Sequence, residues 1–371
     1  MAEQAEGLKK TKRGQKSKPE TSLRLEKIKG RDVTIDNIKG ILVLIFVFIH
    51  TMRNINKSFA LPEWLFYHSN PVFFKWWGFN WLDLGPIAFY FLIGFVVYAA
   101  FEKRRAVEGK AAYKNYFLKN IALVGIMLCL FYIQANALGG SPTQWDYITG
   151  IGFTGVLLIP FLHPFISKHT WAKFAAAALV FAFYFFAHDI LFKFLAPPLS
   201  AGSQQALTDG NLFSVDFYGG SGGGMAASFG FVGVILLVAG IADLAKKKLW
   251  YYAVATAVLY LVGILCTKVF TPHYQLLDIP YMIGALSKFN LIFFVFKLFN
   301  VYVLKGKAIP LVATIGRNLL LFMLVTLLII AFIGLLPKAG VAVAIIEAIV
   351  VIGLYFGLAA LLSKKKTLFK L

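Results

Sequence analysis

Stretches of about twenty consecutive apolar residues recur along this 371-residue chain, and they constrain its fold more than any other feature. Hydrophobic residues make up 59% of the chain and aromatic residues 16%. A soluble domain of this size could not bury so much apolar surface. The alternating ten-residue pattern of a transmembrane barrel does not occur. The sequence therefore predicts an all-α fold, a polytopic membrane helical bundle.

The apolar stretches predict ten transmembrane helices, and the basic residues between them predict their orientation. The helices are expected at 35–53, 82–102, 116–138, 147–166, 171–192, 224–245, 249–270, 279–300, 309–335 and 340–363. Loops on one side carry most of the basic residues, namely Lys103, Arg104, Arg105, Lys110, Lys114, Lys168, Lys246, Lys247, Lys248, Lys305, Lys307, Lys364, Lys365 and Lys366. Loops on the other side carry Arg53, Lys57, Lys75, Lys193 and Lys338. Since basic loops stay in the cytoplasm, both termini are expected there.

Two parts of the chain are expected. Residues 1–30 are polar and basic, and residues 31–371 contain the predicted transmembrane domain. The first segment is expected to be a disordered cytoplasmic tail that touches anionic lipid, and not a cleavable signal peptide. The net charge of +20 is assigned to cytoplasmic loops and this tail, so nucleic acid is not an expected partner. Cys129 and Cys266 lie in apolar spans and indicate neither a disulfide framework nor a metal site.

Two long loops are predicted on the outer side. Residues 54–81 are rich in Trp and Phe, which is typical of an interfacial or re-entrant segment lying against the bilayer. Residues 193–223 contain a glycine-rich run and are expected to form a mobile lid or a flexible loop.

The first predicted helix carries three ionisable residues on one face. Asp36 lies one turn before Lys39, and His50 follows Lys39 by eleven residues, or about three turns. Ionisable groups inside a membrane span are costly and usually face a protein interior or a wet cavity, so a functional site is the first hypothesis. The alternative is that Asp36 and Lys39 mark the membrane interface and His50 ends the helix.

The segment IDNIKGILVLIFVFIH resembles the opening helix of the acyltransferase 3 family of integral membrane acyltransferases. That family has a basic residue, ten intervening residues and a histidine, here Lys39 and His50 after the Asp36–Asn37 pair. The segment DLGPIAFYFLIGFVVY from Asp83 is similar to its second helix. Basic EKRR at 102–105 follows, and the family often has arginine where Lys119 stands.

Two later segments resemble the heparan glucosaminide N-acetyltransferase group of the same transmembrane acyltransferase superfamily. They are WDYITGIGFTGVLLIPF at 145–161 and IGRNLLLF at 315–322. The glycine-arginine-asparagine motif is often followed by tyrosine and histidine, whereas Leu319–Leu324 is apolar here. That group uses a histidine in the outer loop, and His68 occupies roughly that region at an unmatched spacing. We therefore rank His50 above His68.

The resemblance implies an acyltransferase that moves an acyl group, usually acetyl, from cytoplasmic acyl-CoA to a hydroxyl or amine of an extracytoplasmic glycan. His50 is the expected catalytic residue, since histidine can deprotonate an acceptor or carry the acyl group. Asp36 and Lys39 complete the predicted catalytic set, as groups that bind donor or lock the helix. Substrate binding is predicted at Arg53, His68, Asp83, Arg317 and Asn318. Binding of CoA phosphates is predicted at Lys103, Arg104, Arg105 and Lys119.

Alternatives remain open from the residues alone. The intramembrane charges also suit a transporter or flippase for a small solute or lipid-linked sugar, although no inverted repeat is visible. Arg317 could instead form an ion pair that only stabilises the fold. The basic residues at 103–105 could instead be part of the excess of positive charge that cytoplasmic loops carry. The histidines lack metal-ligand spacing, so no metal is expected. The sequence predicts a multi-pass plasma membrane protein and leaves open the acceptor, O- versus N-acetylation and the presence of a homo-oligomer.

Overall fold

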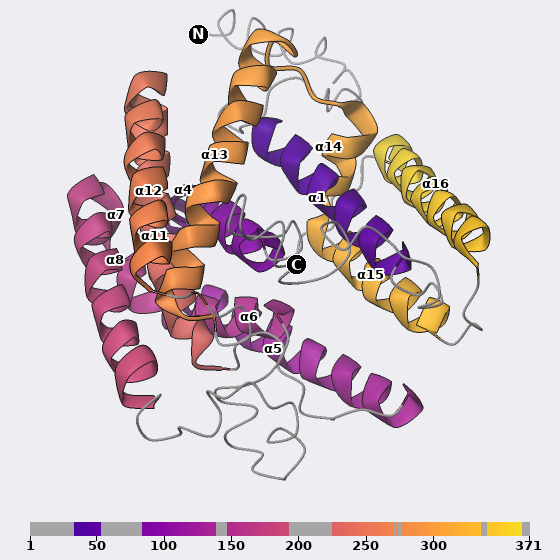
Figure 1. The fold of residues 1–371 in the computed structure, drawn as a ribbon, viewed down its shortest axis with the longest axis horizontal. Coiled ribbons are helices and arrows are strands. Elements are labelled where there is room, and N and C mark those ends of the chain that lie inside the picture. The colour runs from indigo at the N-terminus through magenta and orange to yellow at the C-terminus, as the bar shows by residue number, and fades with distance from the viewer. Residues whose placement is uncertain are drawn as a thin grey trace, which may run out of the picture. The chain divides into compact units, whose positions relative to one another are not determined.

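The computed structural model describes residues 33–52, 84–138, 147–192, 225–270, 272, 277–334 and 340–365 (Figure 1). The described residues from Thr34 onward belong to one compact unit. Secondary structure in the described ranges is helical, as the apolar pattern predicts. The predicted tail at 1–30, the outer loop at 54–81 and the glycine-rich loop at 193–223 all lie outside the described residues.

Helices occupy each of the ten predicted ranges. Their bounds are α1 Val33–Met52, α4 Gly85–Glu108, α5 Ala111–Leu138, α6 Tyr147–Leu157, η2 Ile159–Leu162, α7 Pro164–Lys168, α8 Thr170–Tyr184, the π-helix η3 Phe185–Phe192, α11 Ala227–Lys247, α12 Leu249–Val269, α13 Ile279–Tyr302, α14 Pro310–Arg317, α15 Leu319–Gly334 and α16 Val341–Lys365.

Two of the predicted helices are wrong as continuous elements. The helix predicted at 147–166 ends at Leu157 and continues as the short 3₁₀ turn η2, because Pro160 has no backbone N–H for the helical ladder. The helix predicted at 309–335 is divided at Asn318, which separates α14 from α15. Arg317 and Asn318 therefore lie at a helix junction and not inside one helix.

Six helices in the described ranges are long and apolar enough to cross a membrane. They are Gly85–Glu108, Thr170–His188, Ala227–Lys247, Leu249–Val269, Ile279–Tyr302 and Ala342–Lys364. This agrees with an all-α membrane bundle. The count of ten spans and the cytoplasmic position of both termini stay predictions.

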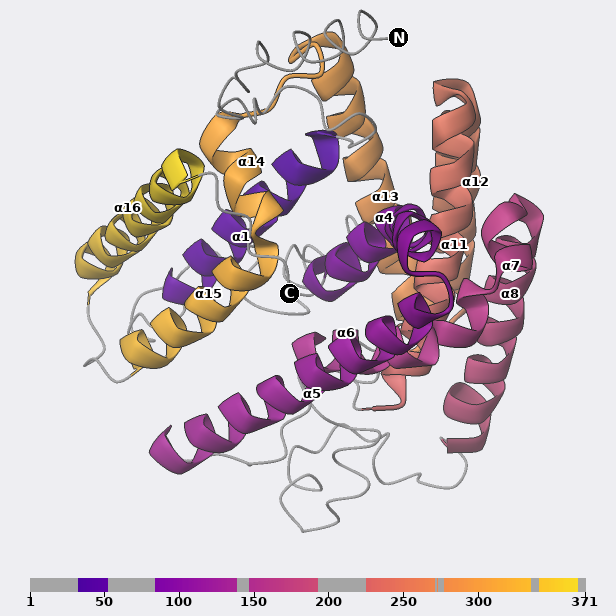
Figure 2. The same ribbon diagram turned by 180° about the vertical axis from the view of Figure 1, so that it is seen from behind.

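The larger core is built around α11, which packs against α4, α8, α12 and α13 (Figures 1 and 2). Gly230, Gly233 and Gly240 lie on the face of α11 that meets α8. A methyl group added at Gly233 would lie 2.7 Å from the ring of Phe181, and one added at Gly240 would lie 2.6 Å from the ring of Phe174. These glycines therefore let the aromatic residues of α8 pack directly on the α11 backbone.

A buried ion pair joins the same two helices. Lys173 of α8 is 1% exposed, and its amine binds the carboxylate of Asp243 on α11. The amine also lies 4.5 Å from the ring centroid of Tyr98 on α4. The other oxygen of Asp243 is 3.5 Å from the amine of Lys246, whose side chain is 54% exposed. The carboxylate of Asp243 thus pairs with two amines, that of the buried Lys173 and that of the exposed Lys246.

A second, smaller core contains residues of α1, α14, α15 and α16, which lie together in both views (Figures 1 and 2). Val43 and Val47 of α1 pack there with Ile315, Phe322 and Tyr355. Tyr355 of α16 also hydrogen-bonds Thr326 of α15 at 2.5 Å. This packing holds α1 against α14, so that the polar residues in the first turn of α1 meet the α14–α15 junction.

Candidate functional site at the first helix and the α14–α15 junction

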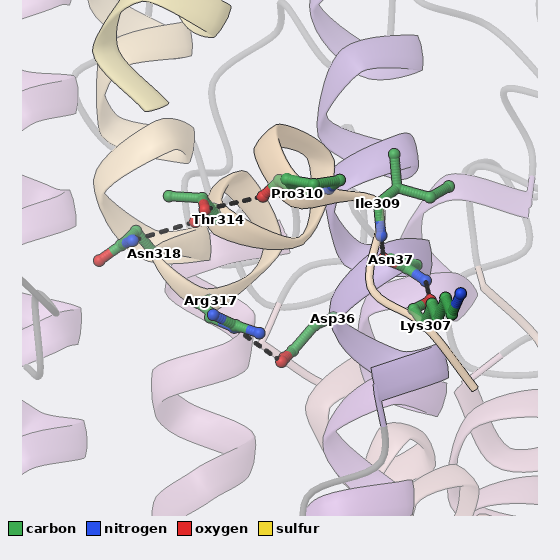
Figure 3. A network of polar contacts seen from close by, with 8 residues as sticks. All are labelled: Asp36, Asn37, Lys307, Ile309, Pro310, Thr314, Arg317 and Asn318. Carbon is green, nitrogen blue, oxygen red and sulfur yellow. Dashed lines mark hydrogen bonds and ion pairs between the residues drawn. The ribbon is translucent and has the colours of Figure 1, made fainter. Parts of the chain in front are cut away.

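An ion pair connects two segments that are far apart in the sequence. The Nε of Arg317 donates to Oδ2 of Asp36 at 3.2 Å, across 281 residues (Figure 3). Asp36 is 2% exposed at its side chain and Arg317 is 19% exposed. Burial of a charge is costly unless it is paired, so this contact fixes the last turn of α14 against the first turn of α1.

The two helices cross with their backbones in contact. A methyl group added at Gly316 would overlap the carbonyl oxygen of Asp36 and would lie 2.9 Å from the backbone nitrogen of Gly40. A methyl group added at Gly40 would likewise overlap the carbonyl oxygen of Val312. Glycine at both positions is therefore required for the distance at which Arg317 reaches Asp36.

Asn37 ties the beginning of α1 to the chain between α13 and α14. Its side-chain oxygen accepts from the backbone N–H of Ile309 at 3.0 Å, and its amide nitrogen donates to the carbonyl of Lys307 at 3.4 Å (Figure 3). Asn300 of α13 donates to the hydroxyl of Thr34 at 2.7 Å. The two contacts of Asn37 satisfy backbone groups just before α14, and the N–H of Ile309 has no partner within that helix.

The break between α14 and α15 occurs at Asn318, which is buried. Its backbone N–H bonds back to Thr314 and Ile315, and its side chain donates to the carbonyl of Thr314 at 3.0 Å. Thr314 in turn donates to the carbonyl of Pro310 at 2.9 Å (Figure 3). Asn318 thus caps the end of α14, and the cap turns Arg317 toward α1.

The guanidinium of Arg317 is only partly used by this pair. Its Nε binds Asp36, and its two terminal nitrogens form no hydrogen bond with any residue in the described ranges. These terminal nitrogens form the planar fork that binds carboxylate and phosphate oxygens in two parallel hydrogen bonds. With 19% of the side chain exposed, Arg317 can take an anion in addition to Asp36.

The structure describes only part of the predicted catalytic set. Asp36 is buried and Lys39, one turn further along α1, is half-buried. His50 lies in α1 near its end, but its side chain is outside the described residues. Fourteen residues separate Asp36 from His50, which is about 21 Å along a helix axis. Asp36 and His50 therefore cannot act on the same atom.

Three of the predicted substrate-binding residues lie outside the described ranges, namely Arg53, His68 and Asp83. The other two, Arg317 and Asn318, lie together at the α14–α15 junction. The contact of Arg317 with Asp36 could not be derived from the sequence, because no periodic pattern links residues in helices so far apart. The roles of Arg317 and Asn318 in binding stay predictions.

The predicted CoA-binding residues form a different group. Arg104 pairs with Glu108 at 3.1 Å, and Arg105 pairs with Glu102 at 2.5 Å, so both arginines bind acidic residues of α4 itself. Lys103 and Lys119 are exposed. Arg105 keeps one buried terminal nitrogen that has no hydrogen-bond partner in the described part of the chain. A buried polar atom without a partner is unusual, so this nitrogen and the exposed amines of Lys103 and Lys119 are the groups of this set that are left for a phosphate.

Sequence reasoning missed the polar contacts made by Asn37, Asn300 and Lys173. Asn300 and Lys173 each lie in an apolar span. Each is at the same height along the bundle as its polar partner on a neighbouring helix, Thr34 for Asn300 and Asp243 for Lys173. A search for polar residues at matched depth in antiparallel spans would have found the Lys173–Asp243 pair. Among the other histidines, His163 caps α7 by accepting from the N–H of Phe165, and His188 is buried against the ring of Tyr184 at 4.7 Å.

Taken as chemistry, the α1–α14 crossing offers a partly open arginine fork, a buried carboxylate and a half-buried lysine one helical turn away. These groups have the charge and the hydrogen-bond donors that binding of an anion requires. No protein-family model matches the chain, and no curated protein matches it either.

Proposed function

We propose that this protein is a membrane acyltransferase that takes an acyl group, acetyl in the simplest case, from acyl-CoA. The acceptor is a hydroxyl or amine of a glycan on the opposite side of the membrane. The observation that carries the proposal is the Asp36–Arg317 ion pair. It joins the first-helix segment and the glycine-arginine-asparagine segment, which are the two parts of the chain that resemble acyltransferases. Two motifs that meet in space are better explained by one shared site than two motifs that lie apart.

The distance along α1 fits a long donor molecule. Acyl-CoA carries its phosphates at one end and its thioester at the other, and an extended pantetheine arm joins them. Arg317 binds the anionic end beside Asp36, and His50 meets the thioester about 21 Å further along the helix. Asp36 then serves to hold Arg317 and α14 in place, and Lys39 adds positive charge on the path between them.

His50 is the residue that acts on the thioester. A neutral imidazole can take the proton of an acceptor hydroxyl as that oxygen attacks the thioester carbonyl, and the thiolate of CoA leaves. The same imidazole can instead attack the carbonyl itself and form an acyl-histidine, which the acceptor then resolves. Both routes place the reacting carbonyl at the far end of α1 from Arg317.

A transporter for an anionic solute is the second candidate, and the helix break at Asn318 favours it. Discontinuous helices form the ion and substrate sites of many secondary transporters, because their ends present free backbone groups. Here Asn318 bonds back onto Thr314 and so caps the end of α14. The two candidates differ in outcome: a transporter moves its solute without acyl-CoA, whereas the acyltransferase consumes acyl-CoA.

Replacing Arg317 with glutamine is expected to weaken acetyl-CoA binding at least about tenfold, since a hydrogen bond to a charged group contributes roughly 1.5–3 kcal/mol. Arg317→Lys keeps the charge but not the fork and should bind with intermediate affinity. Binding of acetyl-CoA to the purified protein in nanodiscs, followed by calorimetry, measures both.

Asp36→Asn is the matched control, because it removes the same ion pair but leaves the guanidinium in place. This variant should lose stability about as much as Arg317→Gln and should still bind acetyl-CoA. If Asp36→Asn and Arg317→Gln lose acetyl-CoA binding equally, Arg317 acts only on the fold.

A further inference from the structure

The end of α7, the end of α11 and the start of α12 lie toward one end of the bundle. Contacts between α8 and α11 show that these helices run in opposite directions, since Phe181 lies against Gly233, Phe174 against Gly240, and Lys173 binds Asp243. As residue numbers fall along α8, they rise along α11. Lys168, at the end of α7 just before α8, therefore lies toward the same end of the bundle as Lys246, Lys247 and Lys248.

These four lysines are all exposed, so this end of the bundle carries positive charge. Asp243 is the acidic residue bound to this cluster, and its two oxygens are already occupied by Lys173 and Lys246. Lys168, Lys247 and Lys248 carry no ion pair in the described part of the chain. Their charge is therefore left for a partner that lies outside the chain.

Aromatic side chains lie toward the same end of the bundle. Trp171 at the start of α8 is 61% exposed and Trp250 at the start of α12 is 69% exposed. The ring of Phe165 lies 5.6 Å from that of Trp171, and the amine of Lys248 lies 6.0 Å from the ring centroid of Tyr251. Exposed tryptophan and tyrosine beside lysine are typical of the headgroup layer of a bilayer, where the rings meet both apolar and polar surroundings.

Apolar residues continue from this end along both helices. Leu179 and Phe183 are exposed on α8, and Val258, Leu261 and Leu265 are exposed on α12. Both α8 and α12 pack against α11. A molecule with a negative head and long apolar chains would match this sequence of basic, aromatic and apolar surfaces.

We propose that Lys168, Lys247, Lys248, Trp171 and Trp250, here called the basic-aromatic patch, bind the phosphate headgroup of an anionic phospholipid. The lysines contact the phosphate, the tryptophans lie at the headgroup level, and the acyl chains lie against the exposed apolar residues of α8 or α12. The lipid comes from the leaflet that faces this end of the bundle. Binding rests on charge complementarity and does not depend on the proposed acyl transfer.

Native mass spectrometry of the full chain in detergent can count bound phosphatidylglycerol beside phosphatidylcholine with the same acyl chains. The test variant is Lys168→Gln/Lys247→Gln/Lys248→Gln, and the control is Lys110→Gln/Lys114→Gln/Lys364→Gln, which removes three exposed lysines elsewhere. Since each lysine near a phosphate surface contributes about 1 kcal/mol, we expect the test variant to lose phosphatidylglycerol affinity at least about tenfold. The control should bind it as the unmodified protein does.

Several outcomes would overturn the proposal. Equal losses in both triple variants would show a general effect of net charge and no site. If the unmodified protein binds phosphatidylglycerol and phosphatidylcholine equally, the negative charge of the lipid does not determine binding. Displacement of the lipid by glycerol phosphate or by coenzyme A at equal concentration would assign the patch to a soluble phosphate compound. Lys168→Arg/Lys247→Arg/Lys248→Arg guards against a folding defect, since it keeps the charge and should keep the lipid.

Discussion

Replacing Gly316 with alanine is expected to lower the free energy of unfolding by about 3 kcal/mol, the upper part of the range for overpacked sites. The added methyl group would overlap the carbonyl oxygen of Asp36, and that oxygen belongs to the backbone of a packed helix. It cannot rotate away as a side chain can. The helices α1 and α14 must therefore separate, and Arg317 then loses its contact with Asp36 at 3.2 Å.

Gly353→Ala is the control for this prediction. Gly353 lies inside α16, and a methyl group added there has no atom within 4 Å. Since alanine is favoured over glycine inside a helix, this change should leave stability unchanged or raise it slightly. Denaturant unfolding in detergent measures both variants. A similar small effect for Gly316→Ala and Gly353→Ala would mean that α1 and α14 do not cross at Gly316.

Asp243→Ala is expected to lower the free energy of unfolding by about 3 kcal/mol, because it leaves the amine of Lys173 buried without a carboxylate. Lys173 is 1% exposed, so water cannot replace Asp243 as its partner without opening the contact between α8 and α11. The value lies at the low end for a broken buried pair, since the side chain of Asp243 is itself 20% exposed.

Two further variants test the asymmetry of this ion pair. Lys173→Met should cost less than Asp243→Ala, because Asp243 keeps Lys246 at 3.5 Å and methionine fills the buried space. Lys246→Ala should change stability by less than about 1 kcal/mol, as expected for an exposed pair. Thermal unfolding of the three variants in one detergent gives the order directly. If Asp243→Ala costs no more than Lys246→Ala, the amine of Lys173 is not held in a buried site.

The membrane helices could be predicted from the sequence because hydropathy is a local property. Twenty apolar residues need no knowledge of their neighbours to indicate a span, and helices are found in all ten predicted ranges. The errors arose where a helix contains a local interruption. At Pro160 the interruption was visible as a residue type, and at Asn318 it depended on a side chain that bonds back to Thr314.

The candidate site was only partly predictable, for a different reason. Asp36 and Arg317 were both identified as costly charges inside apolar spans, which is a local argument. That they bind each other depends on the crossing of α1 and α14, and this crossing depends on Gly40 and Gly316. Sequence alone also could not show that Arg104 and Arg105 bind Glu108 and Glu102, although their spacing along one helix allows both pairs.

Acetyl-CoA binding and hydrolysis by the purified protein in nanodiscs, with His50→Ala beside the unmodified chain, tests the proposed acyl transfer most directly. The proposal predicts saturable binding of acetyl-CoA in both proteins, because Arg317 is unchanged, and loss of hydrolysis by a factor of about 10²–10⁴ in His50→Ala. Unchanged hydrolysis in His50→Ala would show that His50 is not the catalytic residue. Failure of the unmodified protein to bind acetyl-CoA or longer acyl-CoAs would contradict the proposed function as a whole.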